Sequence, residues 1–335
     1  MGEDKILAFI ANPQSGKDIR RFLTCATNTS NAEKVQIAVR IMSSAHAMGV
    51  KRMNLMPDRD GLAFEARAKL SDLGIAAEIE DMSVEGTVDD TFKYIRRIQE
   101  KNAGCLVTLG GDGTARAAAS CCGDIPLLPV STGTNNVYPY HTEGTPIGIA
   151  AAGVLSGRLH EDEIIIRDKR IEVYRNGVFV DIALIDAAVT LTPFKGNKYV
   201  SADDLAAIIV TRSHPASIGL SAIIGVQRLI TPEEPAGAVM LLQHGEKFYV
   251  PISSGCLTPL ACKKPRLLAL EEKWSFDADF HGTVALDGER EIEFHPGDRL
   301  DFFIRHNGPK RVLYHKVCEE MMYINAFAKK SYRED

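Results

Sequence analysis

One carboxylate stands among glycines in the segment Leu106–Thr114 (LVTLGGDGT), where Asp112 follows two glycines and precedes a third. Glycine permits tight backbone turns and a close approach to a ligand. The alanine-rich run that follows has no alternation, so it predicts a helix, and the N-terminus of a helix suits phosphate. A β-hairpin is the alternative, because Asp-Gly is a common hairpin turn. The pattern favours a strand, a phosphate-binding turn that carries a free carboxylate, and a helix.

Two further polar loops follow apolar runs. The loop from Asn12 to Lys17 (NPQSGK) follows the predicted strand Lys5–Ala11, and it can offer backbone N–H groups, a hydroxyl and an ammonium to a phosphate. The loop from Ser131 to Asn136 (STGTNN) follows the predicted strand Ile125–Val130, and its hydroxyls and amides can hold phosphate or ribose oxygens. Taken alone, each loop is also typical of a plain polar turn.

The candidate phosphate-binding and nucleotide-binding residues of the three loops are Asn12, Ser15, Gly16, Lys17, Gly110, Gly111, Gly113, Thr114, Thr132, Gly133, Thr134, Asn135 and Asn136.

The elements that position these loops alternate along the first half of the chain. Helical patterns cover 32–48, 60–73 and 87–101, and short apolar runs cover 52–56, 75–79 and 104–109. Such alternation predicts a parallel sheet with helices on both faces. Ligands of these sheets bind outside the carboxyl ends of the strands. All three loops follow strands, so we expect them to converge at one edge of the sheet.

The second half has a different pattern, with short alternating runs and turn residues. Asn176-Gly177 between two such runs is a strong hairpin signal. These features predict an antiparallel β-rich domain. We therefore expect a Rossmann-like α/β nucleotide-binding domain over residues 1–140 and a β-rich, sandwich-type substrate domain over 141–335, whose C-terminal segment packs back on the first domain.

Carboxylates in the second half are weaker candidates. Asp287-Gly288-Glu289 is either a hairpin turn with solvated carboxylates or a loop placed beside the cleft of the first domain. Asp186 lies in an otherwise apolar run, where an exposed position on a strand face is the favoured interpretation. The nine histidines form no ligand-like cluster in the sequence. Six of them are expected at the surface or satisfied by neighbours, namely His214, His244, His281, His295, His306 and His315.

Composition excludes several classes of protein. The chain has 335 residues, which is enough for two domains, and a net charge of −5, which gives no general affinity for nucleic acid. The longest apolar runs are shorter than the roughly 18 residues that span a bilayer. The N-terminus has no signal-peptide pattern. Seven cysteines without regular spacing suggest reduced thiols, and together these features predict a cytoplasmic protein without stable membrane association.

Taken together, the loops resemble the superfamily of NAD kinases, diacylglycerol kinases and sphingosine kinases. The resemblance is carried by Asn12-Pro13-x-Ser15-Gly16, Gly110-Gly111-Asp112-Gly113-Thr114, Gly133-Thr134-Asn135-Asn136 and Asp287-Gly288-Glu289. Within the superfamily the chain looks most like the ATP-NAD kinase/AcoX-type branch, which is named for acetoin catabolism. The segments Ile10–Arg21 and Ile218–Ile223 carry that nearer likeness.

The resemblance implies an NAD kinase-like fold, with the site between an α/β domain and a β-sandwich domain. It implies an ATP-dependent kinase that transfers a phosphoryl group to a hydroxyl of NAD or a related metabolite, with Asp112 as the catalytic base. It further implies ATP and Mg²⁺ as cofactors, with Mg²⁺ held through phosphates and water rather than by protein ligands alone. Relatives are commonly dimers or tetramers, so a homo-oligomer is implied as well.

The sequence departs from NAD kinases on the acceptor side. NAD kinases carry an Asn-Glu pair early in the second domain, and here the nearest context is Ile185-Asp186-Ala187. They also carry a Thr-Pro-Thr-Gly-Ser-type loop, where this chain has Thr211–Ser217. Two alternatives therefore stay open, a diacylglycerol-type lipid kinase and a non-catalytic nucleotide-binding regulator.

Overall fold

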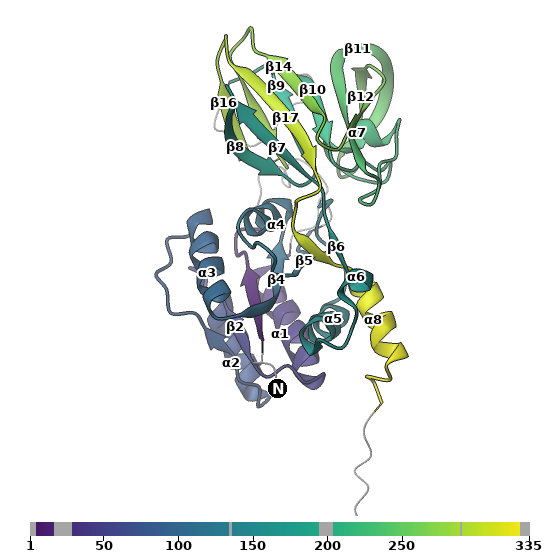
Figure 1. Ribbon diagram of the computed structural model, residues 1–335. Helices are drawn as coiled ribbons and strands as arrows, with labels where there is room; N and C mark the ends of the chain where they lie inside the picture. The colour runs from purple at the N-terminus through teal and green to yellow at the C-terminus, as the bar shows by residue number, and fades with distance from the viewer. Residues whose placement is uncertain (1–4, 17–28, 134–135, 194–203, 289, 329–335) are drawn as a thin grey trace, which may run out of the picture.

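The computed structural model describes residues 5–16, 29–133, 136–193, 204–288 and 290–328. Within them the chain forms an α/β unit, at the bottom of Figure 1, and a β-rich unit above it. The α/β unit contains a mostly parallel sheet, and the β-rich unit contains two antiparallel sheets. The predicted fold class is therefore confirmed. In the described part of the chain, no helix combines the length and the apolar character that crossing a bilayer requires.

The sheet of the α/β unit has the strand order β3-β2-β1-β4-β5-β18-β6. Its strands are β1 (Ile6–Ala11), β2 (Met53–Leu55), β3 (Glu78–Ile79), β4 (Ala103–Gly110), β5 (Leu127–Ser131), β6 (Ile165–Arg167) and β18 (Lys310–Val312). Every residue of β1 is buried, because helices cover both faces of a parallel sheet. The strand order changes direction between β1 and β4, and in open α/β sheets such a switch point forms the ligand crevice.

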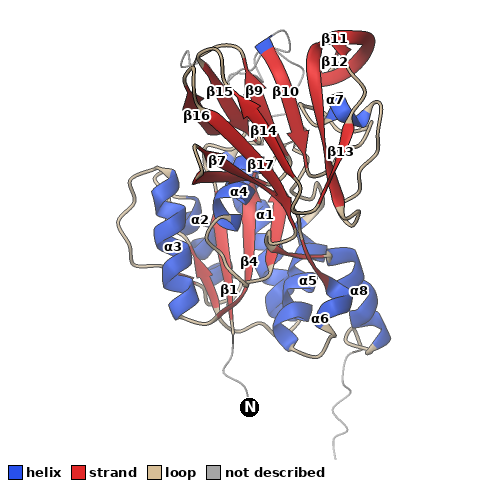
Figure 2. Ribbon diagram, turned by 45° about the horizontal axis from the view of Figure 1, so that its top comes forward, coloured by secondary structure: helices blue, strands red, loops and turns tan. Residues whose placement is uncertain are grey.

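Helices cover this sheet on both sides, as Figure 2 shows. The helices of the unit are α1 (Asn31–Ala47), α2 (Leu62–Asp72), α3 (Val88–Glu100), α4 (Asp112–Ala119), α5 (Gly144–Ser156), α6 (Glu161–Ile164) and α8 (Tyr314–Tyr323). One core cluster joins α1, α2, α5 and α8 to one face of the sheet, and another joins α3 and α4 to the opposite face. Helix α3 begins with a capping box formed by Thr87 and Asp90.

The chain crosses to the β-rich unit near residue 168 and returns near residue 310. Helix α5 packs on α1, and α8 packs on α5 beside α6 (Figure 1). Strands β6 and β18 extend the sheet of the α/β unit. Because α5 and β6 belong to that unit, we propose a domain boundary near residue 168 instead of the expected residue 140, with residues 310–328 as part of the first domain.

The β-rich unit is a sandwich. Its larger sheet has the order β12-β11-β10-β9-β15-β16, with β13 paired to β11, and its smaller sheet has the order β14-β17-β7-β8. The bounds are β7 (Arg170–Arg175), β8 (Val178–Ala183), β9 (Asp186–Thr190), β10 (Leu205–Val210), β11 (Ala236–Ser253), β12 (Cys256–Cys262), β13 (Arg266–Ala269), β14 (Lys273–Asp277), β15 (Gly282–Leu286), β16 (Arg290–Phe294) and β17 (Arg299–Arg305), with the short helix α7 (Ala222–Gly225). The predicted hairpin at Asn176-Gly177 joins β7 to β8, and both turn residues have positive φ.

A corner of the sandwich enters the core of the first unit. Leu184 and Ile185, between β8 and β9, are 0% and 1% exposed, and they pack in one cluster with residues of α3 and α4. An apolar corner in this position ties the second unit to the helix that begins at Asp112.

Candidate functional site

The three predicted loops meet at the carboxyl ends of three neighbouring strands. Strand β1 leads into the Asn12 loop, β4 into the Gly110 loop and β5 into the Ser131 loop, and β4 lies between the other two. The site therefore lies at the switch point of the sheet, where a parallel α/β sheet binds its ligand.

Hydrogen bonds join the three loops to one another. The Asn12 side-chain amide donates to Thr114 Oγ1 at 2.9 Å, and Thr132 Oγ1 donates to Ser15 Oγ at 2.9 Å. The backbone N–H of Thr132 donates to the carbonyl of Gly110 at 3.1 Å. The polar residues that the sequence suggests are therefore brought together by direct contacts.

Two glycines of the Gly110 loop allow this close packing. A Cβ added at Gly110 would lie 2.4 Å from Thr114 Oγ1, and one added at Gly111 would lie 3.0 Å from Asn136 Oδ1. Helix α4 then begins at Asp112, which excludes the alternative hairpin. Its first turn presents backbone N–H groups that have no acceptor within the helix, so this end of α4 can receive a phosphate.

The Asp112 carboxylate holds the chain that follows the third loop. Asp112 Oδ1 accepts hydrogen bonds from the backbone N–H of Tyr138 at 2.8 Å and of Val137 at 3.1 Å, and Oδ2 accepts from Val137 at 3.1 Å. Asp112 is half-buried, as are Asn12, Ser15, Gly111 and Asn136, while Gly16, Gly110, Gly113, Thr114, Thr132 and Gly133 are buried. Lys17, Thr134, Asn135 and Glu289 lie outside the described residues.

A buried lysine that the sequence analysis did not single out supports the first loop. Lys34 of α1 is fully buried, and its ammonium donates to the carbonyls of Asn12 at 3.1 Å, Pro13 at 3.0 Å and Ser15 at 2.6 Å. Its spacing from Ala38 places it on the buried stripe of α1. A lysine at a core position of a helical pattern is the signal that could have identified it.

An ionic cluster between the two units was also missed. The buried Asp168 carboxylate accepts from the Tyr138 hydroxyl at 2.7 Å and from Arg311 Nε at 2.7 Å, and it lies 3.1 Å from Arg212 Nη2. Burial raises the pKa of this carboxyl, but the guanidinium groups of Arg212 and Arg311 lower the pKa by a larger amount. The pKa therefore lies below its usual value. These residues are scattered in the sequence, so no local pattern reveals them.

The second-domain carboxylates have structural contacts. Asp287 begins the turn between β15 and β16 and is 7% exposed, so the interpretation of solvated carboxylates is wrong for it. Its carboxylate accepts from the backbone N–H groups of Leu184 at 2.9 Å, Ile185 at 2.8 Å and Asp186 at 3.1 Å. Burial raises its pKa. Asp287 therefore shapes the apolar corner that packs near α4.

Asp186 is 6% exposed, so the expectation of an exposed strand position is wrong as well. It begins β9, where its backbone pairs with Asp287. Gly288 has a φ of 68°, the left-handed conformation that the tight turn requires. His295 is exposed and His281 contacts Glu293, as expected of surface or satisfied residues, but the two histidines and Glu293 form a ligand-like cluster that the sequence did not indicate.

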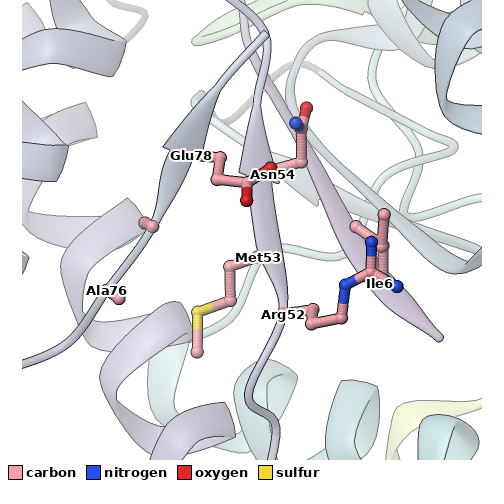
Figure 3. A pocket seen from close by; sticks show the side chains of 7 residues that line it. Ile6, Arg52, Met53, Asn54, Ala76 and Glu78 are labelled. Atoms are coloured by element: carbon pink, nitrogen blue, oxygen red, sulfur yellow. The ribbon is translucent and has the colours of Figure 1, made fainter. Parts of the chain in front are cut away.

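One cavity, of about 100 Å³, lies away from these loops. Figure 3 shows it between β1, β2 and β3, where it is lined by Ile6, Arg52, Met53, Asn54, Ala76, Ala77 and Glu78. Ile6 and Met53 are the first residues of their strands, so the cavity opens near the amino ends of the sheet. The loops that suit phosphate lie at the opposite ends.

Two family models agree with the two-part architecture. Residues 7–158 match a family model described as the ATP-NAD kinase N-terminal domain, and residues 169–307 match one described as the acetoin catabolism protein X C-terminal domain. A solved NAD kinase from Archaeoglobus fulgidus in complex with ATP aligns at 16% identity with a TM-score of 0.45, covering 83% of this chain and 100% of that chain.

The assignment to a family rests on a sequence relative. Acetoin catabolism protein X of Cupriavidus necator is 35% identical over 316 residues, which cover 88% of this chain and 86% of that protein. Identity of this extent spans both structural units. The chain therefore belongs to the ATP-NAD kinase/AcoX-type family.

Proposed function

We propose that the chain binds ATP at the three converging loops and transfers its terminal phosphoryl group to a hydroxyl of a small metabolite. The observation that carries the proposal is the meeting of the Asn12, Gly110 and Ser131 loops at the switch point between β1 and β4. Phosphoryl transfer depends mainly on positioning and on charge stabilisation, and these loops are built for both.

The residues present suit a nucleotide phosphate. Glycines at 110 and 111 let the side chains of Thr114 and Asn136 pack against the loop backbone, and the N-terminus of α4 supplies N–H donors. Hydroxyls of Ser15 and Thr132 and the amide of Asn12 line the same edge. Mg²⁺, when bound with ATP, would screen the phosphate charge and keep several water ligands, since it prefers few protein ligands.

Asp112 is the proposed base. Its carboxylate is half-buried at the end of α4, and backbone N–H groups of Val137 and Tyr138 hold its orientation. A carboxylate with a fixed orientation can accept the proton of an acceptor hydroxyl as the phosphoryl group is transferred. The acceptor stays at the level of a hydroxyl-bearing metabolite, NAD or a related compound, because the sequence has no adjacent Asn-Glu pair of the kind that NAD kinases carry.

A second candidate is a non-catalytic nucleotide-binding regulator. Both oxygens of Asp112 accept backbone hydrogen bonds, an arrangement that a purely structural carboxylate would also show. In this alternative, nucleotide binding would act through the contacts of Tyr138 with the second unit.

The deciding experiment measures binding and transfer separately. ATP binding is followed by calorimetry, and transfer is followed with labelled ATP and Mg²⁺ against a panel of hydroxylated metabolites that includes NAD. Asp112→Asn is expected to keep ATP binding and to lose turnover by about 10²–10⁴-fold. Asp124→Asn is the control, because the side chain of Asp124 is 75% exposed and pairs only with Arg167 in the contacts described.

The outcomes separate the alternatives. ATP binding without transfer to any acceptor would favour the regulator, and undiminished turnover in Asp112→Asn would remove Asp112 as the base. Absence of ATP binding would overturn both proposals. Transfer only to diacylglycerol in vesicles, with sedimentation on anionic liposomes, would favour the lipid kinase.

A further inference from the structure

A cluster of metal-ligating side chains lies at the end of the β15–β16 hairpin. His281 precedes β15, Glu293 belongs to β16 and His295 follows it. The possible ligand atoms of the three side chains all lie within 4.8 Å of one another. His281 Nε2 is 2.6 Å from Glu293 Oε1, and the two imidazole ring centres are 4.5 Å apart.

The register of the hairpin produces this cluster. Gly282 pairs with Phe294 and Thr283 pairs with Glu293, so the next pair outward is His281 with His295. Because side chains alternate across a strand, residues 293 and 295 point to the same face. Phe294 between them is fully buried in the sandwich core. The two imidazoles and the carboxylate therefore share the outer face.

The backbone that carries the cluster is anchored. The Asp298 carboxylate accepts from the backbone N–H of His295 at 2.9 Å, and the Asp298 N–H donates to the His295 carbonyl at 3.0 Å. Gly297 N–H donates to Ala278, next to the start of the hairpin, at 2.8 Å. Ligands on a paired and anchored strand need little rearrangement to meet one ion.

We propose that His281, Glu293 and His295 bind a divalent transition metal of the Zn²⁺ class. Imidazole and carboxylate ligands suit Zn²⁺, which takes them at about 2.0–2.2 Å. Three protein ligands leave a fourth position for water. The ion would replace the hydrogen bond between His281 and Glu293, and it would join the edge strand β16 to β15.

The site is separate from the nucleotide loops. Strand β15 lies between His281 and Asp287. Asp287 is at the contact with the first unit, and the seven residues 281–287 span roughly 20 Å when extended. Strand β16 is the edge strand of the larger sheet, and β15 lies between β9 and β16, as Figure 2 shows. The proposal therefore does not depend on the proposed kinase activity, and its ligand set differs from the oxygen ligands that Mg²⁺ prefers.

The test uses the full chain without a histidine tag, stripped with a chelator and dialysed. Cys256 is replaced by serine in every protein, because its exposed thiol could bind Zn²⁺ itself. Titration with Zn²⁺ is followed by calorimetry, and Co²⁺ absorption reports the ligand geometry. We expect one saturable site per chain and a melting temperature that rises with Zn²⁺ concentration.

His281→Ala and His295→Ala are expected to weaken Zn²⁺ binding by more than the roughly 10–100-fold that loss of an outer-shell partner costs. Glu293→Gln keeps the size of the side chain and removes a ligand charge, so it tests the site even if a histidine variant fails to fold. His306→Ala is the matched control, an exposed histidine outside the cluster. Equal Zn²⁺ affinity in the cluster variants and the control, or no saturable binding, would overturn the proposal.

Discussion

The hydroxyl of Tyr138 donates a 2.7 Å hydrogen bond to the buried carboxylate of Asp168. The backbone N–H of the same tyrosine donates to Asp112 at 2.8 Å. One residue thus connects the start of helix α4 to the ionic cluster where the chain crosses between its two units. A change at this connection should affect the stability of the joined units, because it lies in the core between them.

Tyr138→Phe should lower the free energy of unfolding by about 1.5–3 kcal/mol, the usual worth of a hydrogen bond to a charged group. The ring stays in place beside Arg212, whose guanidinium carbon lies 5.0 Å from its centre, so the packing is retained. Urea denaturation measures the change. Tyr323→Phe, at a residue 70% exposed, should stay within about 0.5 kcal/mol of the parent. Equal stability of the two variants would contradict the predicted role of the hydroxyl.

Asp168→Asn should destabilise the protein by about 3–5 kcal/mol at pH 7, because it leaves two guanidinium groups without their buried anion. The pKa of Asp168 is lower in the folded state than the usual 3.8, so unfolded chains take up the proton first as the pH falls. The stabilisation is therefore present above about pH 4, and it is lost as the pH falls through the folded-state pKa.

Urea denaturation from pH 3 to pH 7 tests this prediction. The difference in free energy of unfolding between the parent and Asp168→Asn should become smaller toward pH 3. Asp277→Asn serves as a control, since it removes a surface pair with Arg299 that is worth about 0–1 kcal/mol. A stability difference that stays constant with pH would show that folding does not lower the pKa of Asp168.

Lys34→Met should destabilise the protein by at least about 1–3 kcal/mol, the cost of one buried carbonyl without a donor. It should also weaken ATP binding, because the Asn12 loop loses the ammonium that orders three of its carbonyls. Denaturation and calorimetry measure the two effects. Lys69→Met, on the exposed side of α2 and paired with Glu65, should change stability by only about 0.2–0.5 kcal/mol. Unchanged ATP affinity in Lys34→Met would show that Lys34 does not contribute to ATP binding.

Leu184→Ala should lower the free energy of unfolding by about 2–5 kcal/mol, because it opens a cavity in the core between the two units. Leu257→Ala, at a residue 63% exposed, should have little effect. Thermal unfolding followed by calorimetry should show whether the two units then melt separately. A loss of stability in Leu184→Ala as small as that in Leu257→Ala would contradict the packing of the Leu184 corner against α4.

Local sequence patterns predicted much of the fold and the three phosphate-suited loops of the site. The apolar run before Gly110 and the alanines after Thr114 predicted strand, turn and helix, and the structure confirms each. These signals are local, because a glycine-rich turn and a helix N-terminus depend on adjacent residues. The Asn176-Gly177 hairpin was predicted for the same reason.

Packing over long distances decided what local patterns left open. The sequence favoured Asp287 equally as a solvated turn residue. Its carboxylate is instead buried, and it accepts a hydrogen bond from the backbone N–H of Leu184, more than a hundred positions away. His281 and His295 show no ligand spacing in the sequence and meet only because β15 and β16 pair in one register. Residue types and spacing therefore determined the phosphate-suited loops of this protein. Its tertiary structure alone decided which distant carboxylates, guanidiniums and imidazoles share a site. The reason is that strand pairing and burial act between residues that lie far apart in the sequence.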